Sequence, residues 1–534
     1  MRQFILYSFI LLTFKIISQP ANINISNTTV FGGEPFIAIN PTNPNNIVIA
    51  WMALDITTAF RTTIKTKVSM DGGQTWGSPY NQPHMSPSWG SADASMAFRK
   101  NGTLYLCYVD YRQSPDSGGV YLTHSTNDGV SWTLPTRAWN ANAEDPSKLP
   151  LDRPWLAVDN STATTKGMFY MTTKPAPWIP APNRAYLKSS KDSGAIWSNY
   201  RYVDTTNYLI GSLIQAPMTA LCVAADGALC LAYPSYVATQ SPFPKILFAK
   251  SYNKGGTFSR YDLLVNPSAV PSPNNYKLGY NLCANPNNPN QLAACFVGNN
   301  LGDPDVYVST TNNGGLTWNA PVRTNDDGIS NGKAQDLVWA TYSTNNKLLA
   351  VWRDKRNGAG TGYYQPSDVY CAVSINNGAS FQNNIRLSNV SVPHDTILTQ
   401  SGNDFLSCEL NNDTIYATWG DVRTGKLNIF FTKTSITTGL GIKPFLINNE
   451  AVSVISAFPN PSSGKLNFKF NTDKLKAFQI TVYNAEGKEV LKTQIENNFN
   501  SAINLSALSN GVYFLKGENE GQLIYLERII LNKN

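Results

Sequence analysis

Charged and hydroxyl-bearing residues recur at one position of a repeated pattern, just ahead of short apolar segments. The aligned positions hold Glu34, Asp93, Arg153, Ala216, Tyr280, Asp336 and Asp404, with Asp152 beside Arg153. Carboxyl groups gathered at one place can take different pKa values and then serve as acid and base, as glycoside hydrolysis requires. The candidate catalytic residues are therefore Asp93, Asp152, Arg153 and Asp336, and Glu34, Tyr280 and Asp404 are candidate ligand-binding residues.

The same carboxyl groups allow other interpretations. They are suitable acceptors for sugar hydroxyls, and they are ligands for a hard cation such as calcium. A structural alternative is that they bind free amides at strand starts and hold neighbouring sheets together. His84, His124 and His394 lack the spacing of zinc ligands. We expect no cofactor, with calcium as the alternative.

A second group of charged residues follows a later strand of the pattern. Three copies of Asp-x-Arg occur at residues 110–112, 354–356 and 421–423, and Arg353 adjoins the middle copy. Arginine binds carboxylates through two parallel hydrogen bonds, so Arg353, Arg356 and Arg423 are candidate ligand-binding residues. The aspartate two residues earlier favours the alternative that these arginines form internal ion pairs.

The elements that must position these residues are short strands. The octet Ser/Thr-x-Asp/Asn-x-Gly-x-x-Trp/Phe occurs at residues 69–76, 125–132, 190–197, 251–258, 311–318 and 374–381. Its Asp or Asn binds backbone amides of its own turn, its Gly permits positive φ, and its aromatic residue packs against the strands. A hairpin corner that recurs about every 60 residues indicates a radial repeat of small sheets.

Seven strand units accompany these six octets. The seventh unit ends at residues 428–433 without an octet or a fourth strand, whereas residues 22–27 (NINISN) resemble the fourth strand at residues 384–389 (NIRLSN). We expect the N-terminal strand to complete the last sheet and close the ring, which removes exposed sheet edges. The predicted fold is all-β: a seven-bladed β-propeller, with six blades as the alternative, followed by a small immunoglobulin-like β-sandwich.

The octets are identified as Asp-boxes, and residues 19–445 resemble the sialidase-like (BNR-repeat) β-propeller superfamily. True sialidases carry a Phe/Tyr-Arg-Ile-Pro motif near the start, where this chain has EPFI at residues 34–37. The resemblance therefore implies a channel-mouth site without assigning a reaction. We expect a glycan-binding or adhesive propeller. The alternative is a glycoside hydrolase, including an exo-α-sialidase built on Arg153.

Both ends of the chain carry export signals. Residues 1–18 have the basic start and short apolar stretch of a signal peptide. Residues 450–534 contain PNP (459–461), YNAEG (483–487) and GVY (511–513), and resemble a type A sorting domain of the type IX secretion system. The resemblance implies a Bacteroidota-type cell, passage through the periplasm, contact with the secretion machinery, and release or attachment at the outer cell surface.

The bulk composition excludes other partners. The 42 Lys and Arg residues and 35 Asp and Glu residues are spread along the chain, so no basic tract points to nucleic acid. No later segment is apolar enough to span a membrane, and we expect a monomer. For the seven cysteines, buried thiols are favoured over disulfides between Cys222 and Cys230 or between Cys283 and Cys295.

Overall fold

The computed structural model divides into two compact units, Met1–Gly439 and Leu440–Asn534. It describes residues 20–55, 61–112, 117–140, 144–148, 150–176, 179, 183–205, 218–235, 245–265, 279–361, 364–393, 402–436, 445–447, 450–452, 455–470, 476–484, 488–497, 501–519 and 522–533. These residues are all-β apart from isolated turns such as η1 (Pro146–Lys148). The predicted signal peptide lies outside the described residues.

The described part of the first unit forms seven four-stranded antiparallel sheets, here numbered 1 to 7. Sheet 1 contains β2 (Gly32–Ile39), β3 (Ile47–Asp55), β4 (Arg61–Ser69) and β5 (Tyr80–Asn81). Sheet 2 contains β6 (Trp89–Phe98), β7 (Leu104–Arg112), β8 (Gly118–Ser125) and β9 (Thr136–Asn140). Sheet 3 contains β10 (Leu151–Val158), β11 (Phe169–Pro175), β12 (Tyr186–Ser190) and β13 (Arg201–Tyr202).

The remaining four sheets repeat this order. Sheet 4 contains β14 (Ala220–Val223), β15 (Leu229–Ser235), β16 (Lys245–Ser251) and β17 (Ser259–Val265). Sheet 5 contains β18 (Tyr280–Ala284), β19 (Leu292–Gly298), β20 (Asp305–Thr311) and β21 (Val322–Arg323). Sheet 6 contains β22 (Gln335–Tyr342), β23 (Leu348–Asp354), β24 (Asp368–Ser374) and β25 (Ile385–Arg386). Sheet 7 contains β26 (Ser407–Asn411), β27 (Thr414–Asp421), β28 (Asn428–Ser435) and β1 (Asn22–Asn24).

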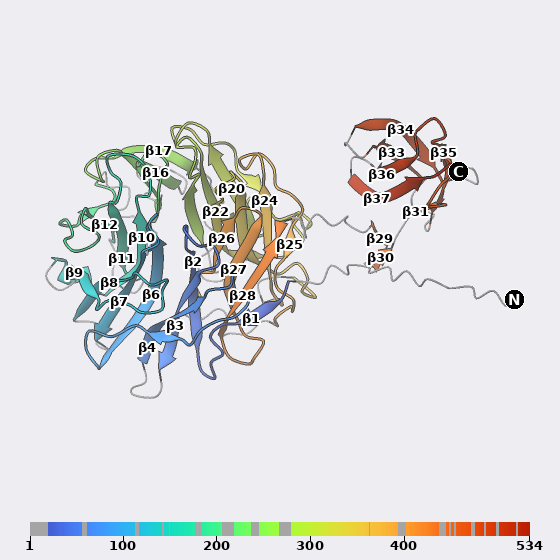
Figure 1. Ribbon diagram of the computed structural model, residues 1–534. Helices are drawn as coiled ribbons and strands as arrows, with labels where there is room; N and C mark the ends of the chain where they lie inside the picture. The colour runs from blue at the N-terminus through green and yellow to red at the C-terminus, as the bar shows by residue number, and fades with distance from the viewer. Residues whose placement is uncertain are drawn as a thin grey trace. The chain divides into compact units, whose positions relative to one another are not determined.

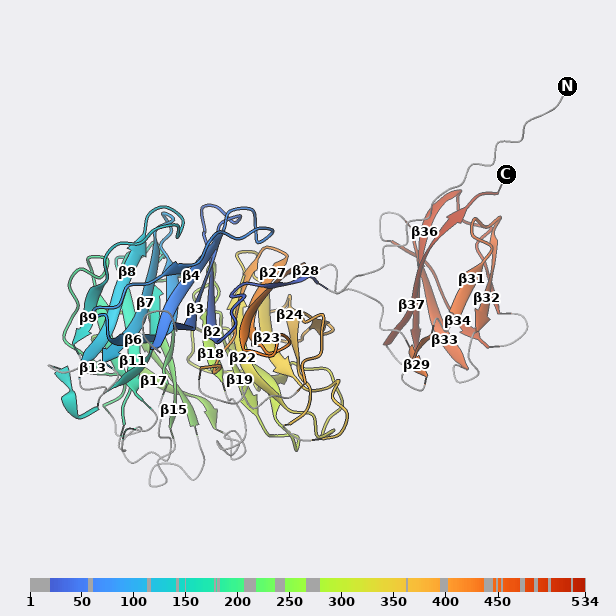
Figure 2. The same cartoon turned by 90° about the horizontal axis from the view of Figure 1, so that it is seen from below.

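The sheets pack in a closed cycle. The first strand of each sheet contacts the first strand of the next, in the order β2, β6, β10, β14, β18, β22, β26 and back to β2 (Figures 1 and 2). The apolar side chains of consecutive sheets therefore share the cores between them. In sheet 1, for example, Val48 and Ala50 pack with Leu106 and Tyr108 of sheet 2.

The six octets fold alike. In the first, Ser69 Oγ donates to Asp71 (2.8 Å), and Gly73 N and Thr75 N donate to Ser69 Oγ (2.8 Å) and Asp71 (2.9 Å). The same three bonds recur in the other five octets. Each octet glycine has positive φ and lies against the preceding sheet, and Gly73 of sheet 1 lies against Phe431 of sheet 7. The octets thus join neighbouring sheets at the end of β4 and its equivalents.

Side chains of the first strands bind backbone amides of the next sheet. Ser95 Oγ accepts from Leu156 N (3.0 Å), and Asn281 Oδ1 accepts from Ala340 N (3.1 Å). Ser407 Oγ accepts from Ile37 N (2.8 Å), which is the same contact made from sheet 7 to sheet 1. The contact that closes the cycle is therefore chemically equivalent to contacts inside it.

The N-terminal strand completes sheet 7, as predicted from the resemblance of residues 22–27 to a fourth strand. β1 pairs antiparallel with β28, with Asn22 opposite Thr432 and Ile23 opposite Phe431 (Figure 1). Ile25, just beyond β1, is buried, and its amide donates to Ile429 O (2.8 Å). The two ends of the first unit are thus held in one sheet.

The second unit contains two antiparallel sheets around one core. One consists of β31 (Ile455–Phe458), β32 (Lys465–Phe470) and β35 (Ala502–Asn504). The other consists of β33 (Ala477–Tyr483), β34 (Glu489–Glu496), β36 (Gly511–Asn519) and β37 (Gln522–Leu531). Alternating residues such as Leu466, Ile480 and Leu515 fill the core between them. A separate hairpin joins β29 (Phe445–Ile447) and β30 (Glu450–Val452).

All seven cysteines are thiols in the structure, and all except Cys222 are buried. Cys222 and Cys230 are direct cross-strand partners on β14 and β15. Cys283 lies opposite Ala293, and Cys295 lies opposite Asn281, so this second pair is diagonal.

Candidate functional site

A backbone irregularity at the start of the first strands sets the direction of the charged side chains there. The pairing of β2, β6, β10 and β22 with their partners shifts register near the start of each strand. The residues there with left-handed backbone are Glu34 (φ 53°), Asp93 (φ 56°), Arg153 (φ 49°) and Leu337 (φ 52°). A side chain in this region costs roughly 1–3 kcal/mol, and bulges redirect side chains next to functional sites. Three of these four strained residues are charged, and they lie in sheets 1 to 3.

The predicted alignment of Asp336 is wrong by one residue. Leu337 takes the position of Glu34 and Arg153, and Asp336 is equivalent to Asp152, because each lies directly before the left-handed residue. The offset follows from the cross-strand register, and aligning Trp339 with Trp155 in the sequence reproduces it. Asp336 is fully buried and pairs with Arg353, its cross-strand partner (Nε–Oδ1 2.7 Å), with Lys355 Nζ at 3.8 Å.

The structure brings Glu34, Asp93, Asp152, Arg153 and Asp404 together. The Arg153 guanidinium donates to the Asp404 carboxylate, and Arg153 N donates to Asp93 Oδ2 (3.3 Å). The Asp93 carboxyl group hydrogen-bonds to both Glu34 and Asp152. We call these five residues the carboxyl–arginine cluster. Its members come from sheets 1, 2, 3 and 7.

Lys174 on β11 is a further member of the site that the sequence did not reveal. It is buried, lies opposite Asp152 across the strands, and donates to the Asp152 carboxylate. The pair Asp152–Lys174 in sheet 3 is equivalent to the pair Asp336–Arg353 in sheet 6. Its sequence signal was weak, because Lys174 lies near the end of β11 without a motif around it.

The cluster separates the pKa values of its carboxyl groups. Burial raises the pKa of Glu34 to about 7, and the charge of Asp404 adds to this shift. Burial, with the nearby Asp152 and Glu34, raises the pKa of Asp93 well above its usual range. For Asp152 burial acts in the same direction, but Lys174 and the Asp93 hydrogen bond outweigh it and hold the pKa below its usual value. The cluster thus favours the protonated forms of Asp93 and Glu34 and the ionised form of Asp152.

A cavity adjoins this cluster. It has a volume of about 60 Å³ and is lined by Phe36, Trp155, Leu156, Met218, Ala220, Leu221, Tyr280, Asn281 and Trp339. Arg153 reaches it, because Arg153 Nη1 lies 3.8 Å from Met218 Sδ. Tyr280, a predicted ligand-binding residue, is a wall of the cavity and donates its hydroxyl hydrogen to Met218 O. Ala216, the aligned residue of sheet 4, lies outside the described residues.

Aromatic rings form one side of the cavity. Trp155 lies 6.1 Å from Phe36, 5.6 Å from Trp339 and 5.2 Å from Phe405, measured between ring centroids. The Arg153 guanidinium carbon lies 5.9 Å from the centre of the Phe405 ring. Phe36, Trp155 and Trp339 occupy equivalent strand positions, each the first paired residue after the register shift. This shared position of three aromatic residues is visible in the sequence and was a usable signal for the site.

The other predicted arginines are held by internal partners. Arg356 donates to Asp354 (2.7 Å) and Asp326 (2.6 Å) and lies over the Tyr370 ring (4.2 Å). Arg423 donates to Asp421 (2.6 Å) and Asn389 (2.6 Å) and lies over the Phe430 ring (4.3 Å). In the first Asp-x-Arg copy, the Asp110 carboxylate instead accepts from Met85 N (2.7 Å) and contacts His84 Nδ1 (2.8 Å).

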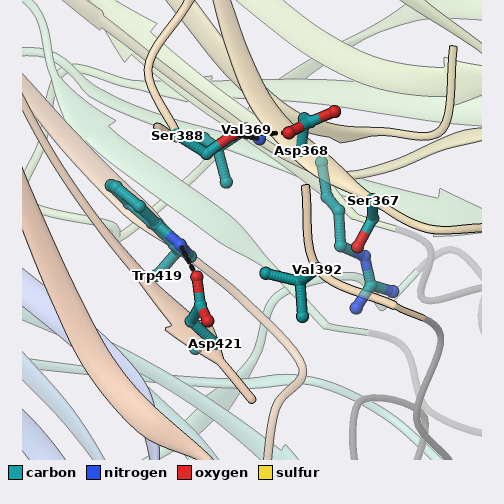
Figure 3. A pocket seen from close by; sticks show the side chains of 9 residues that line it. Ser367, Asp368, Val369, Ser388, Val392, Trp419 and Asp421 are labelled. Atoms are coloured by element: carbon teal, nitrogen blue, oxygen red, sulfur yellow. Dashed lines mark hydrogen bonds between the residues drawn. The ribbon is translucent and has the colours of Figure 1, made fainter. Parts of the chain in front are cut away.

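A second cavity lies between sheets 6 and 7 and has a volume of only about 10 Å³ (Figure 3). Its polar residues are engaged with protein groups: Asp368 accepts from Ser388 (2.9 Å) and Arg386 (2.6 Å), and Trp419 Nε1 donates to Asp421 (3.1 Å). This cavity therefore has the character of an inter-sheet packing gap. Among the described residues, no group of three or more His, Cys, Asp or Glu side chains has a geometry that holds a metal ion.

Comparison with known proteins identifies the second unit. Residues 456–532 match the family model of the secretion system C-terminal sorting domain. The chain is thus an exported β-propeller with a type IX sorting domain, which directs secretion or attachment at the outer cell surface. That domain implies an interaction with the secretion machinery. The described residues include no helix that is both long and apolar enough to cross a membrane.

Solved structures that resemble the chain are also propeller-type enzymes, but at a distance. A phage phi92 endosialidase shares 11% identity over 96% of this chain and 88% of its own, with a TM-score of 0.44. A Penicillium chrysogenum α-L-arabinanase shares 10% identity over 79% of this chain and 99% of its own, with a TM-score of 0.41. Such weak likenesses carry no argument about activity. No curated protein sequence matches the chain.

Proposed function

We propose that the protein is an exported, glycan-binding β-propeller of seven blades, one for each four-stranded sheet, and that its ligand binds at the carboxyl–arginine cluster and the adjoining cavity. A concave site with aromatic walls and a few convergent polar groups is the usual form of a small-ligand site. Aromatic rings offer sugar rings an apolar surface, while carboxylates and an arginine offer partners for hydroxyl groups.

The observation that carries binding over hydrolysis is the direct contact among the carboxyl groups. Asp93 hydrogen-bonds to both Glu34 and Asp152, so these three groups form one continuous chain. The paired carboxyl groups of glycosidases stand roughly 5 Å or more apart, because the scissile bond lies between them. Asp93 is too close to Glu34 and to Asp152 to form such a pair with either of them. The three groups are better suited to holding a fixed array of acceptors.

Glycoside hydrolysis is the second candidate, and the protonation of Glu34 favours it. A carboxyl group with a pKa of about 7 retains a proton near neutral pH and can act as a general acid. Asp404 or Asp152 would then be the ionised partner. Asp336 is not a suitable catalyst, because it is fully buried and bound to Arg353.

The test combines binding and turnover on the full chain. Binding is measured on a glycan array and by calorimetry, and turnover with fluorogenic glycosides, sialosides included. We expect binding without turnover, and loss of binding in Arg153→Ala. Asp262→Asn, at an exposed position of sheet 4, is the matched control. Turnover that disappears in Glu34→Gln would support the hydrolase instead. A folded chain that neither binds nor cleaves any glycan would refute both functions.

A further inference from the structure

The charges around the cavity indicate which sugars it accepts. Resting on the proposed glycan-binding function, we propose that the site takes an uncharged sugar residue and discriminates against sialic acids and uronic acids. Three observations support this ligand class: the other predicted ligand-binding arginines are already paired with internal aspartates, Arg153 itself is surrounded by carboxyl groups, and the cavity wall is predominantly apolar.

The first observation concerns the arginines that would be needed to hold an anionic sugar. Arg353 is buried against Asp336, with Nε 2.7 Å from Oδ1. Arg356 and Arg423 each bind an aspartate two residues earlier and lie flat over an aromatic ring. If any of these arginines bound a ligand instead, a buried carboxylate would lose its partner, which is strongly unfavourable. These arginines are therefore fixed parts of the blades.

The second observation is the balance of charge at Arg153. Its guanidinium already binds Asp404, and Glu34, Asp93 and Asp152 lie close enough to stabilise its charge further. The described part of the site contains four carboxyl groups and two cationic side chains, Arg153 and Lys174. Lys174 is already bound to Asp152. A ligand carboxylate would have to displace Asp404 from Arg153 and then lie close to Asp404 and Asp152, which disfavours it.

The third observation is the chemistry of the cavity. Phe36, Trp155 and Trp339 provide rings, and Met218 and Leu221 complete an apolar surface. Its own polar residues are Tyr280 and Asn281, and the adjoining cluster adds carboxyl groups that can accept hydrogen bonds from hydroxyl groups. An uncharged sugar suits both the carboxyl groups and the aromatic wall. Its hydroxyl groups donate to the carboxylates, and its C–H face packs against the rings.

Matched pairs of glycans test this proposal on the full chain. The best neutral binder from the array is compared by calorimetry with the uronic-acid or sialylated form of the same oligosaccharide, and with an amine-bearing form. We expect the acidic form to bind at least tenfold more weakly than the neutral one. Equal or tighter binding of the acidic or amine-bearing form would overturn the ligand class while leaving glycan binding intact. No binding of any glycan would overturn the proposed function as well.

A substitution separates charge discrimination from a structural role. Asp404→Asn removes the charge that occupies Arg153 but keeps the shape of the side chain. We expect the ratio of the affinity for the neutral glycan to the affinity for the acidic glycan to fall at least fivefold. The reason is that Arg153 can then bind a ligand carboxylate. Asp262→Asn should leave the ratio unchanged, and a merely destabilised site would lose affinity for both forms equally. An unchanged ratio in folded Asp404→Asn would contradict the proposal.

Discussion

Arg153 on β10 of sheet 3 binds Asp404, which precedes β26 of sheet 7. These residues are 251 positions apart in the chain, and sheets 3 and 7 are not neighbours in the cycle of first-strand contacts. The ion pair therefore links distant sheets at the end of the molecule where the first strands begin.

Removing Arg153 should destabilise the propeller measurably. Both side chains are partly buried, with relative exposures of 16% for Arg153 and 26% for Asp404. Arg153→Ala leaves four carboxyl groups without that cation, and we expect a loss of about 2–4 kcal/mol in the free energy of unfolding. Denaturant titration of the full chain measures it, with Asp262→Asn as the control. A loss no larger than that of the control would show that the pair contributes nothing to stability.

Stability should fall as the pH rises towards neutrality. The folded chain holds a proton on Glu34 up to a pKa of about 7, whereas the unfolded chain releases it near 4.5. The stabilisation is therefore complete below about pH 4.5 and is lost as the pH rises through 7, by at most about 3 kcal/mol for this group. Asp404, Asp93, Asp152 and Arg153 are the charged groups around it.

The measurement is the free energy of unfolding between pH 4.5 and 7.5. Glu34→Gln should flatten the decline without abolishing it, because burial raises the pKa of Glu409 to about 7 as well. Glu409→Gln should remove a separate part of the decline in the free energy of unfolding. Identical slopes for the wild type and both variants would contradict the assigned protonation states.

The octet glycine Gly315 should be far less replaceable than Gly425, which also has positive φ. A Cβ on Gly315 (φ 95°) would lie 2.1 Å from the nearest atom of the buried Phe248 ring in the preceding sheet. Gly425 (φ 78°) has open space at the same place. We expect Gly425→Ala to cost about 1 kcal/mol, and Gly315→Ala about 2–4 kcal/mol through conformation and overpacking together. Equal costs in thermal denaturation would mean that the octets do not join the sheets.

The repeat was readable from sequence because its determinants are local. Octet hydrogen bonds span at most four residues, so Ser69, Asp71 and Gly73 specify their own corner. The carboxyl–arginine cluster depends instead on the register between strands. The offset between Asp336 and Leu337 is visible in the sequence only when Trp339 is aligned with Trp155. Phe405 and Met218 lie in the repeat copies that contain Asp404 and Ala216, but only the packing of the sheets places them beside Arg153. Lys174 acquires its role only from the strand opposite.

The N-terminal strand should be necessary for a stable monomer. Without residues 20–27, β28 would be left with an unpaired edge, and the buried Ile25 would be lost from the core between sheets 7 and 1. Exposed strand edges pair with other chains. We expect this truncation to lower the melting temperature and to produce dimers or aggregates in light scattering. Ile25→Ala, which keeps the strand, should lose about 2–4 kcal/mol of stability and remain monomeric. A truncated chain that stays monomeric and equally stable would show that the N-terminal strand is dispensable.

Asp336 should prove essential for stability and irrelevant to ligand binding. Its carboxylate is fully buried against Arg353 and near Lys355, whose pKa falls to about 8 because of burial even with Asp336 beside it. Asp336→Asn leaves the Arg353 charge without its partner, and we expect a loss of about 3–5 kcal/mol.

The double variant Asp336→Asn/Arg353→Gln should recover part of that loss, because it removes both charges. Glycan affinity per folded molecule should match the wild type in both variants, whereas Asp404→Asn should change it. If Asp336→Asn abolished binding while leaving the free energy of unfolding intact, Asp336 would belong to the ligand site. The assignment of that site to sheets 1, 2, 3 and 7 would then be wrong.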